Sequence, residues 1–199
     1  VRGFERPVRR LGQAEIGRSE RVVLESPVER RLCCGGRCRR RPLEAVLDLA
    51  EVEIDPSTGI IKIVSYVIVD DFGVTLNPLM LAGQVHGGAM QGIGQALMEQ
   101  AVYSPTDGQL VTGTFMDYAM PRAADGPSFV FETHNVPCTT NPLGVKGAGE
   151  AGAIGSCPAV VNAIVEGLHR EFGIDHIDMP ATPERVWIAI REAQRRHTL

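Results

Sequence analysis

The residues best suited to chemistry lie in one glycine-rich stretch, residues 141–152, which reads Asn-Pro-Leu-Gly-Val-Lys-Gly-Ala-Gly-Glu-Ala-Gly. Its one carboxylate, Glu150, stands among small neutral residues. Glycines are needed where a backbone comes close to a ligand, and a carboxylate that such a site desolvates is suited to act as a general base. The alternative is a plain loop in which Glu150 begins the next helix, where an acidic side chain favours the helix dipole. The loop alone favours this alternative, because glycine-rich loops are common.

A second unusual stretch is the helix that the periodic apolar residues predict from Asn77-Pro78 to about Gln100. Its interior holds five glycines, Gly83, Gly87, Gly88, Gly92 and Gly94. Each costs up to about 1 kcal/mol relative to Ala in a helix interior, so they predict either close packing or a ligand near the backbone, with no preference between the two. The glutamines of this stretch, Gln84, Gln91 and Gln95, offer neutral hydrogen bonds to a ligand, or lie on the surface.

Other polar residues give weaker signals. The five cysteines, Cys33, Cys34, Cys38, Cys138 and Cys157, fit neither a disulfide framework nor a zinc or iron–sulfur spacing. Asp70-Asp71 ends a predicted strand and is interpreted as a solvated turn rather than a metal site. His134 is interpreted as a structural or exposed residue.

The distribution of charge divides the chain. Residues 1–43 hold twelve arginines, no lysine and five acidic residues, a net charge of +7, whereas residues 44–199 carry −11 and the whole chain −4. The sequence therefore predicts a basic N-terminal segment, 1–43, that is disordered or translated out of frame, followed by one domain, 44–199. A basic arm can bind nucleic acid, but this one lacks interleaved aromatic residues and a known motif, so nucleic acid is not expected as a partner.

The elements after residue 43 predict an α+β fold. Residues 45–54 and 60–69 form a β-hairpin around a Pro-Ser-Thr-Gly turn, residues 102–111 carry a second hairpin signal, and 128–136 form another strand. Helices are expected at 151–172 and from 183 to about 194. We therefore expect β-hairpins and a small mixed sheet packed against several helices. Neither a signal peptide nor an apolar run of about 18 residues is found, so a membrane span is not predicted and a cytoplasmic location is expected.

Three segments, 83–97, 141–152 and 178–187, together resemble the C-terminal part of the molybdenum-binding large subunit of the xanthine oxidase / aldehyde oxidase family. The resemblance covers about residues 44–199 and is strongest to the bacterial aerobic carbon-monoxide-dehydrogenase type. It implies a portion of a molybdopterin-binding domain. Residues 1–43 do not match the family.

The resemblance implies molybdenum–molybdopterin cytosine dinucleotide as cofactor, with no iron–sulfur cluster or FAD in this chain. Glu150 takes the family's position of general base beside a hydroxyl on molybdenum, with water as the source of oxygen for a small carbon substrate. Residues expected to border the cofactor are Gly83, Gln84, Lys146, Gly147, Ala148 and Gly149, whereas no residue of this chain is expected to ligate the metal. Expected partners are the remaining large-subunit polypeptide, an iron–sulfur subunit and an FAD subunit.

The same resemblance leaves alternatives open. The chain lacks the segment that carries the other half of the molybdenum pocket, so we expect no activity without it. The sequence Gly149-Glu150-Ala151-Gly152 resembles the broad hydroxylase group rather than the strict carbon-monoxide oxidisers, and the substrate stays open. The alternative function is a non-catalytic truncated remnant, or a partner-binding domain that retains no cofactor.

Overall fold

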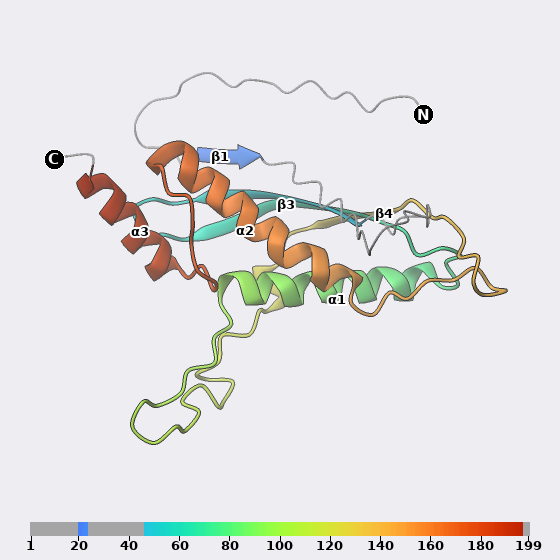
Figure 1. Ribbon diagram of the computed structural model, residues 1–199, viewed down its shortest axis with the longest axis horizontal. Coiled ribbons are helices and arrows are strands. Elements are labelled where there is room, and N and C mark those ends of the chain that lie inside the picture. Colours follow the sequence, from blue (N-terminus) through green and yellow to red (C-terminus); the bar gives the residue numbers. More distant parts are fainter. Residues whose placement is uncertain (1–19, 24–45, 197–199) are drawn as a thin grey trace, which may run out of the picture.

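The computed structural model describes residues 20–23 and 46–196, and its centre is a four-stranded mixed sheet in the order β1–β2–β3–β4 (Figure 1). The strands are β1 Glu20–Val23, β2 Val46–Ile54, β3 Ile61–Asp70 and β4 Phe129–Thr133. β2 and β3 form the predicted antiparallel hairpin, whereas β4 pairs with β3 in parallel. Apart from β1, which pairs with β2, the predicted segment 1–43 lies outside the described residues, together with its three cysteines.

The turn between β2 and β3 is fixed by hydrogen bonds within it and by a contact with helix α3. The Asp55 carboxylate accepts hydrogen bonds from Ser57 and Thr58 at 2.7–2.9 Å. Gly59 follows with φ of 74°, and a Cβ there would stand 2.0 Å from the carbonyl oxygen of Pro183. The turn therefore needs glycine both for its backbone conformation and for its contact with the start of helix α3.

Helix α1, Pro78–Leu97, begins where the sequence predicts. The side chain of Asn77 accepts a hydrogen bond from the Met80 amide at 3.1 Å, which caps the helix. The helix lies against α2, Ala151–Phe172 (Figure 1). A Cβ on Gly92 would stand 1.9 Å from the Ser156 Oγ, and one on Gly152 2.2 Å from the Val85 carbonyl oxygen. Close helix packing thus explains part of the glycine content of α1.

Helix α2 has the predicted limits and ends at Gly173, whose φ is 64°. Pro158 lies inside this helix. Among the described helices, α2 alone is long and apolar enough to cross a membrane, as judged by its length and composition only. Half of its most apolar stretch is buried in the protein, however, as in the core helix of a soluble protein.

Helix α3, Pro183–Arg196, closes the opposite end of the molecule from the glycine-rich loop (Figure 1). Val186 and Ile190 are fully buried. Trp187 is 38% exposed, and its ring lies against the guanidinium of Arg191, whose central carbon is 5.4 Å from the ring centroid.

The core lies between the sheet, α1 and α2. Its largest fully buried apolar side chains are Val52, Ile68, Val85, Ile93, Val160, Ile164, Leu168, Val186 and Ile190. The second predicted hairpin is reduced to a single antiparallel bridge between Tyr103 and Leu110. It belongs to an excursion, residues 98–122, that projects away from the sheet and helices (Figure 1). A short 3₁₀ turn, Ala123–Asp125, leads from it to β4.

Candidate functional site

The glycine-rich loop is anchored to the chain that follows β3. Val74 donates its backbone N–H to the Gly144 carbonyl at 2.9 Å, and Lys146 donates its own to the Phe72 carbonyl at 3.0 Å. Inside the loop, the Asn141 side chain accepts from the amide of Val145 and donates to its carbonyl. Residues 141–146 are therefore a fixed continuation of the sheet edge rather than a free linker.

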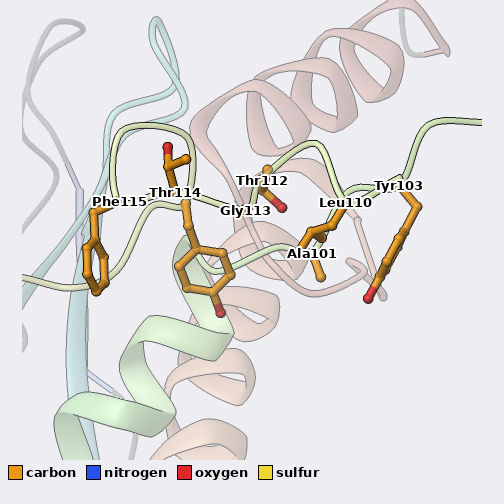
Figure 2. Close-up of a pocket in the computed structure, with 8 residues that line it drawn as sticks. Ala101, Tyr103, Leu110, Thr112, Gly113, Thr114 and Phe115 are labelled. Atoms are coloured by element: carbon orange, nitrogen blue, oxygen red, sulfur yellow. The ribbon is translucent and has the colours of Figure 1, made fainter. Parts of the chain in front are cut away.

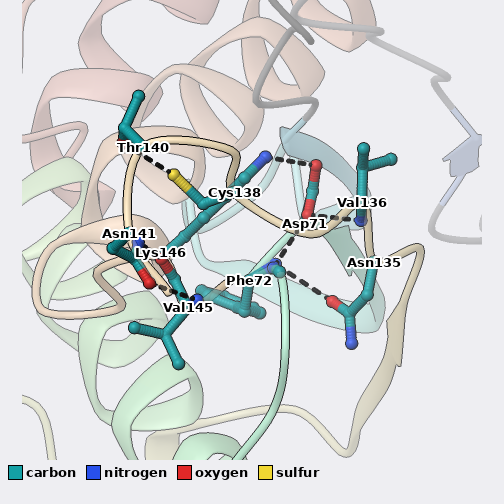
Figure 3. A network of polar contacts seen from close by, with 10 residues as sticks. Asp71, Phe72, Asn135, Val136, Cys138, Thr140, Asn141, Val145 and Lys146 are labelled. Carbon is teal, nitrogen blue, oxygen red and sulfur yellow. Dashed lines mark hydrogen bonds and ion pairs between the residues drawn. The ribbon is translucent and has the colours of Figure 1, made fainter. Parts of the chain in front are cut away.

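A buried ion pair reinforces this anchor (Figure 3). The Lys146 Nζ lies 2.6 Å from the Asp71 Oδ2, and the two side chains are 7% and 3% exposed. The Asp71 Oδ1 accepts hydrogen bonds from the amides of Gly73 and Val136, both at 2.9 Å. Burial alone raises the pKa of Asp71, but the hydrogen bonds from Lys146, Val136 and Gly73 and the charge of Lys146 lower it further, so the net shift is downward.

The expected solvated turn at Asp70-Asp71 is therefore wrong, since both residues are buried. Strand β4 and the segment after it cover the end of β3, and the amide of Phe72 donates to the Asn135 side chain at 3.0 Å. This covering depends on a parallel strand pairing between residues some sixty positions apart in the chain. A local motif at Asp70-Asp71 carries no information about it.

One hydrogen bond joins the two stretches in which sequence analysis placed the cofactor contacts. The Gln84 Nε2, on α1, donates to the Gly149 carbonyl at 3.0 Å. The loop is thus held at Lys146 by the end of β3 and at Gly149 by α1. The structure brings Gly83 and Gln84 to the same edge of the molecule as residues 146–149.

Between these two anchors the backbone N–H groups are unpaired. Among the described residues, the N–H groups of Gly147, Ala148 and Gly149 have no hydrogen-bond acceptor. A Cβ on Gly147 or Gly149 would meet nothing within 4 Å, and the same holds for Gly83 and Gly87 on α1. These four glycines face open space, unlike Gly88 and Gly92. The site can therefore offer backbone donors and small surfaces to a ligand.

Glu150 follows directly, as the residue that precedes the first turn of α2. It is exposed and its side chain makes no capping hydrogen bond. The desolvation that sequence analysis expected around this carboxylate is thus not supplied by the described residues. The carboxylate stands instead at the positive end of a 22-residue helix, beside the bare amides of the loop.

Sequence analysis missed a buried acidic cluster under the helices. The carboxyl groups of Asp48 and Asp70 and the hydroxyl of Tyr66 are buried and have no hydrogen-bond partner among the residues that the structure describes. Burial, and then the charge of Asp70, raise the pKa of Asp48 to about 7, and burial raises the pKa of Asp70 to about 6. The alternation of side chains along a strand could have indicated the burial of Asp48, because it puts Asp48 on the same face of β2 as the buried Ala50.

The aromatic side chains near this cluster come from three elements. The His86 ring of α1 stacks on Phe129 of β4, with ring centroids 5.1 Å apart. Phe129 in turn meets Tyr66 of β3 edge to face at 5.5 Å. This stack ties α1, and with it Gln84, to the sheet. His134, by contrast, is exposed, as expected.

A cavity lies elsewhere, on the excursion 98–122 (Figure 2). It has a volume of about 320 Å³ and is lined by Ala101, Tyr103, Leu110, Thr112, Gly113, Thr114, Phe115 and Tyr118. The cavity contains neither a charged side chain nor a residue of the glycine-rich loop. In the described part of the chain, no group of three His, Cys, Asp or Glu side chains is placed to hold a metal ion.

Comparisons with known proteins agree on the class. The family described as "Molybdopterin cofactor-binding domain" matches residues 41–127. The chain is 42% identical to the nicotine 6-hydroxylase large subunit of Paenarthrobacter nicotinovorans and 35% identical to the carbon monoxide dehydrogenase large chain of Hydrogenophaga pseudoflava, over 68% and 72% of its length. It covers only 16% and 18% of those proteins. The solved quinoline 2-oxidoreductase of Pseudomonas putida 86 superposes with a TM-score of 0.69 at 39% identity, over 75% of this chain and 19% of that one.

The fold is accordingly that of part of a molybdopterin-binding domain, with the predicted α+β arrangement of helices and a small mixed sheet. The chain belongs to the xanthine oxidase family and corresponds to part of a molybdopterin-binding large subunit. It spans less than a fifth of the length of the curated relatives named above, and these relatives are large subunits of multi-subunit enzymes.

Proposed function

We propose that this chain forms one wall of the cofactor site of a molybdenum hydroxylase, with Glu150 as the general base. The enzyme inserts oxygen from water into a small carbon substrate. The observation that carries this proposal is the hydrogen bond from the Gln84 Nε2 to the Gly149 carbonyl. It joins the two proposed cofactor-contacting segments and leaves Glu150 exposed at their junction.

The residues at this edge fit a molybdopterin cofactor in its cytosine dinucleotide form. The unpaired N–H groups of Gly147, Ala148 and Gly149 match a ligand rich in hydrogen-bond acceptors, and open space surrounds the two glycines. Open space also surrounds Gly83 on α1, and the Gln84 Oε1 is able to accept a hydrogen bond from a ligand. The ammonium of Lys146 is neutralised by Asp71, so Lys146 contributes backbone rather than charge. When bound, the cofactor supplies the acceptor for the two electrons of the oxidation.

Glu150 is suited to take a proton from a group that approaches the loop. Among the described residues, no hydrogen-bond donor competes for its carboxylate. A polypeptide that covers the loop would desolvate the carboxylate and strengthen it as a base. Because this cover is absent from the described residues, we expect the chain to act only inside the complete subunit.

The proposed partner is the remaining large-subunit polypeptide, joined to an iron–sulfur subunit and an FAD subunit. The excursion 98–122 supports this assembly, because its Phe115 and Met116 are 84% and 93% exposed. Apolar side chains of this size, grouped on one projecting segment, are typical of a surface that is covered in the native assembly.

The test of the proposed function is oxygen labelling in the reconstituted complex. The chain is produced together with the rest of a large subunit and the two electron-transfer subunits, and the turnover product is analysed by mass spectrometry in ¹⁸O-labelled water. Nicotine and quinoline are the first compounds to test, because they are named as substrates of relatives at 42% and 39% identity. Label from water supports a hydroxylase of this kind, whereas label from dioxygen, or a complex without molybdenum, contradicts it.

A further inference from the structure

The ion pair between Asp71 and Lys146 connects three segments that are far apart in the sequence. Asp71 follows β3, its Oδ1 binds the amide of Val136 after β4, and its Oδ2 binds Lys146 in the glycine-rich loop (Figure 3). Each of these contacts is 2.6–2.9 Å long. The carboxylate therefore lies at the point where the loop leaves the sheet.

The position of the Asp71 carboxylate determines where the segment with unpaired N–H groups, residues 147–149, begins. Lys146 is bound twice, by its Nζ to Asp71 and by its amide to the Phe72 carbonyl. The next anchored group is the Gly149 carbonyl, which accepts from Gln84. Only two residues, Gly147 and Ala148, separate the anchors, so a displacement of Lys146 is transmitted almost directly to Gly149 and Glu150. Of these two residues, Gly147 has no side chain and Ala148 contributes only a partly buried methyl group.

The ion pair between Asp71 and Lys146 has one stable arrangement. Both side chains are at least nine-tenths buried, so neither charge can be solvated if its partner is lost. Asp71 accepts from two amides in addition to Lys146, which fixes its rotamer. Asp71 does not reach the surface of the site and cannot touch a ligand there.

We propose that Asp71 is a positioning residue for the proposed base Glu150, acting through Lys146 and the glycine-rich loop. The proposal rests on the function proposed above for Glu150, although its structural part does not. Loss of either charge releases Lys146, and the loop then no longer holds Gly149 and Glu150 in one place against α1.

Amide hydrogen exchange in the full 199-residue chain tests the structural part. Val74 and Lys146 are the reporters, because their N–H groups donate to Gly144 and Phe72 across the anchor. We expect Asp71→Asn and Lys146→Met to speed exchange at both reporters at least tenfold, and Lys146→Arg, which keeps the charge, to restore most of the protection. The matched control is Ile190→Ala, which removes a fully buried side chain in α3 and should leave the ratio of loop exchange to core exchange unchanged.

Steady-state kinetics of the reconstituted enzyme test the functional part. Asp71→Asn should lower kcat 10–100-fold at constant molybdenum content while KM stays within threefold, whereas Arg122→Gln, which breaks the exposed pair with Asp125, should leave both unchanged. Exchange at Val74 and Lys146 within twofold of the parent chain in Asp71→Asn and Lys146→Met, or an unchanged kcat, overturns the proposal. If the parent complex has no activity, the proposed function fails, and the exchange result still decides whether Asp71 fixes the loop.

Discussion

Gln84 and Gly149 lie 65 residues apart in the sequence, and the side-chain amide of the first donates to the carbonyl oxygen of the second at 3.0 Å. This contact joins helix α1 to the glycine-rich loop immediately before Glu150. The contact places two stretches that are separate in the sequence side by side at one edge of the molecule.

Replacement of Gln84 by Leu should loosen the loop without unfolding the domain. The hydrogen bond is exposed, so its loss should cost only about 0.5–1 kcal/mol in the free energy of unfolding, measured by urea denaturation of the 199-residue chain. In the reconstituted complex, molybdenum and cytidine nucleotide content should fall. Gln95→Leu is the matched control, because Gln95 is also an exposed glutamine of α1. Equal cofactor content in the two variants would argue against a cofactor contact at Gln84.

Two glycines of α1 should respond in opposite directions to the same substitution. Gly92→Ala should destabilise by about 1–3 kcal/mol, since its Cβ would stand 1.9 Å from the Ser156 Oγ and 3.0 Å from the Cys157 amide nitrogen. Gly87→Ala should stabilise by up to about 1 kcal/mol, because open space surrounds the position and Ala is the better helix former. Urea denaturation of both variants measures the difference. A loss of stability in Gly87→Ala would contradict the open surface described here.

The buried acids give the domain a pH-dependent stability. The pKa of Asp48 is raised to about 7 and that of Asp70 to about 6, so the folded state binds protons that the unfolded state has already released above pH 4. Stability should therefore fall as pH rises from about 4 to about 7. Asp48→Asn should remove part of this loss and stabilise the chain at pH 8 by about 2–4 kcal/mol, since one unit of pKa corresponds to about 1.4 kcal/mol. At pH 4 its effect should be small, and an equal effect at both pH values would contradict the assignment.

Asp71 should show the opposite dependence on pH. Its pKa is lowered in the folded state, so its contribution is present above the unfolded value, near 3.8, and is lost as pH falls further. Lys146→Met leaves the buried carboxylate unpaired and should cost about 3–5 kcal/mol at pH 7. Urea denaturation at pH 7 and pH 3 measures this, and the cost should shrink at the lower pH. A constant cost would indicate that lost packing, rather than charge, dominates.

The local elements of this fold follow from the sequence, whereas the contacts that build the site do not. Asn77 and Gly173 mark helix ends through interactions within a few residues, and the predicted start of α1 and end of α2 are confirmed. The burial of Asp70 and Asp71 depends instead on β4, which pairs with β3 in parallel across an intervening helix and excursion. Likewise, the composition of α1 could not assign Gly88 to helix packing and Gly83 to open space, because that division depends on where α2 lies.

The central claim is that Glu150 is the general base, and the most direct measurement is the turnover of Glu150→Gln in the reconstituted complex. Gln keeps the size of the side chain and removes its ability to accept a proton. The matched control is Glu132→Gln, at an exposed glutamate of β4. At equal molybdenum occupancy, we predict that kcat falls by about 10²–10⁴-fold in Glu150→Gln and is unchanged in the control. Unchanged turnover of Glu150→Gln at full occupancy would contradict the account.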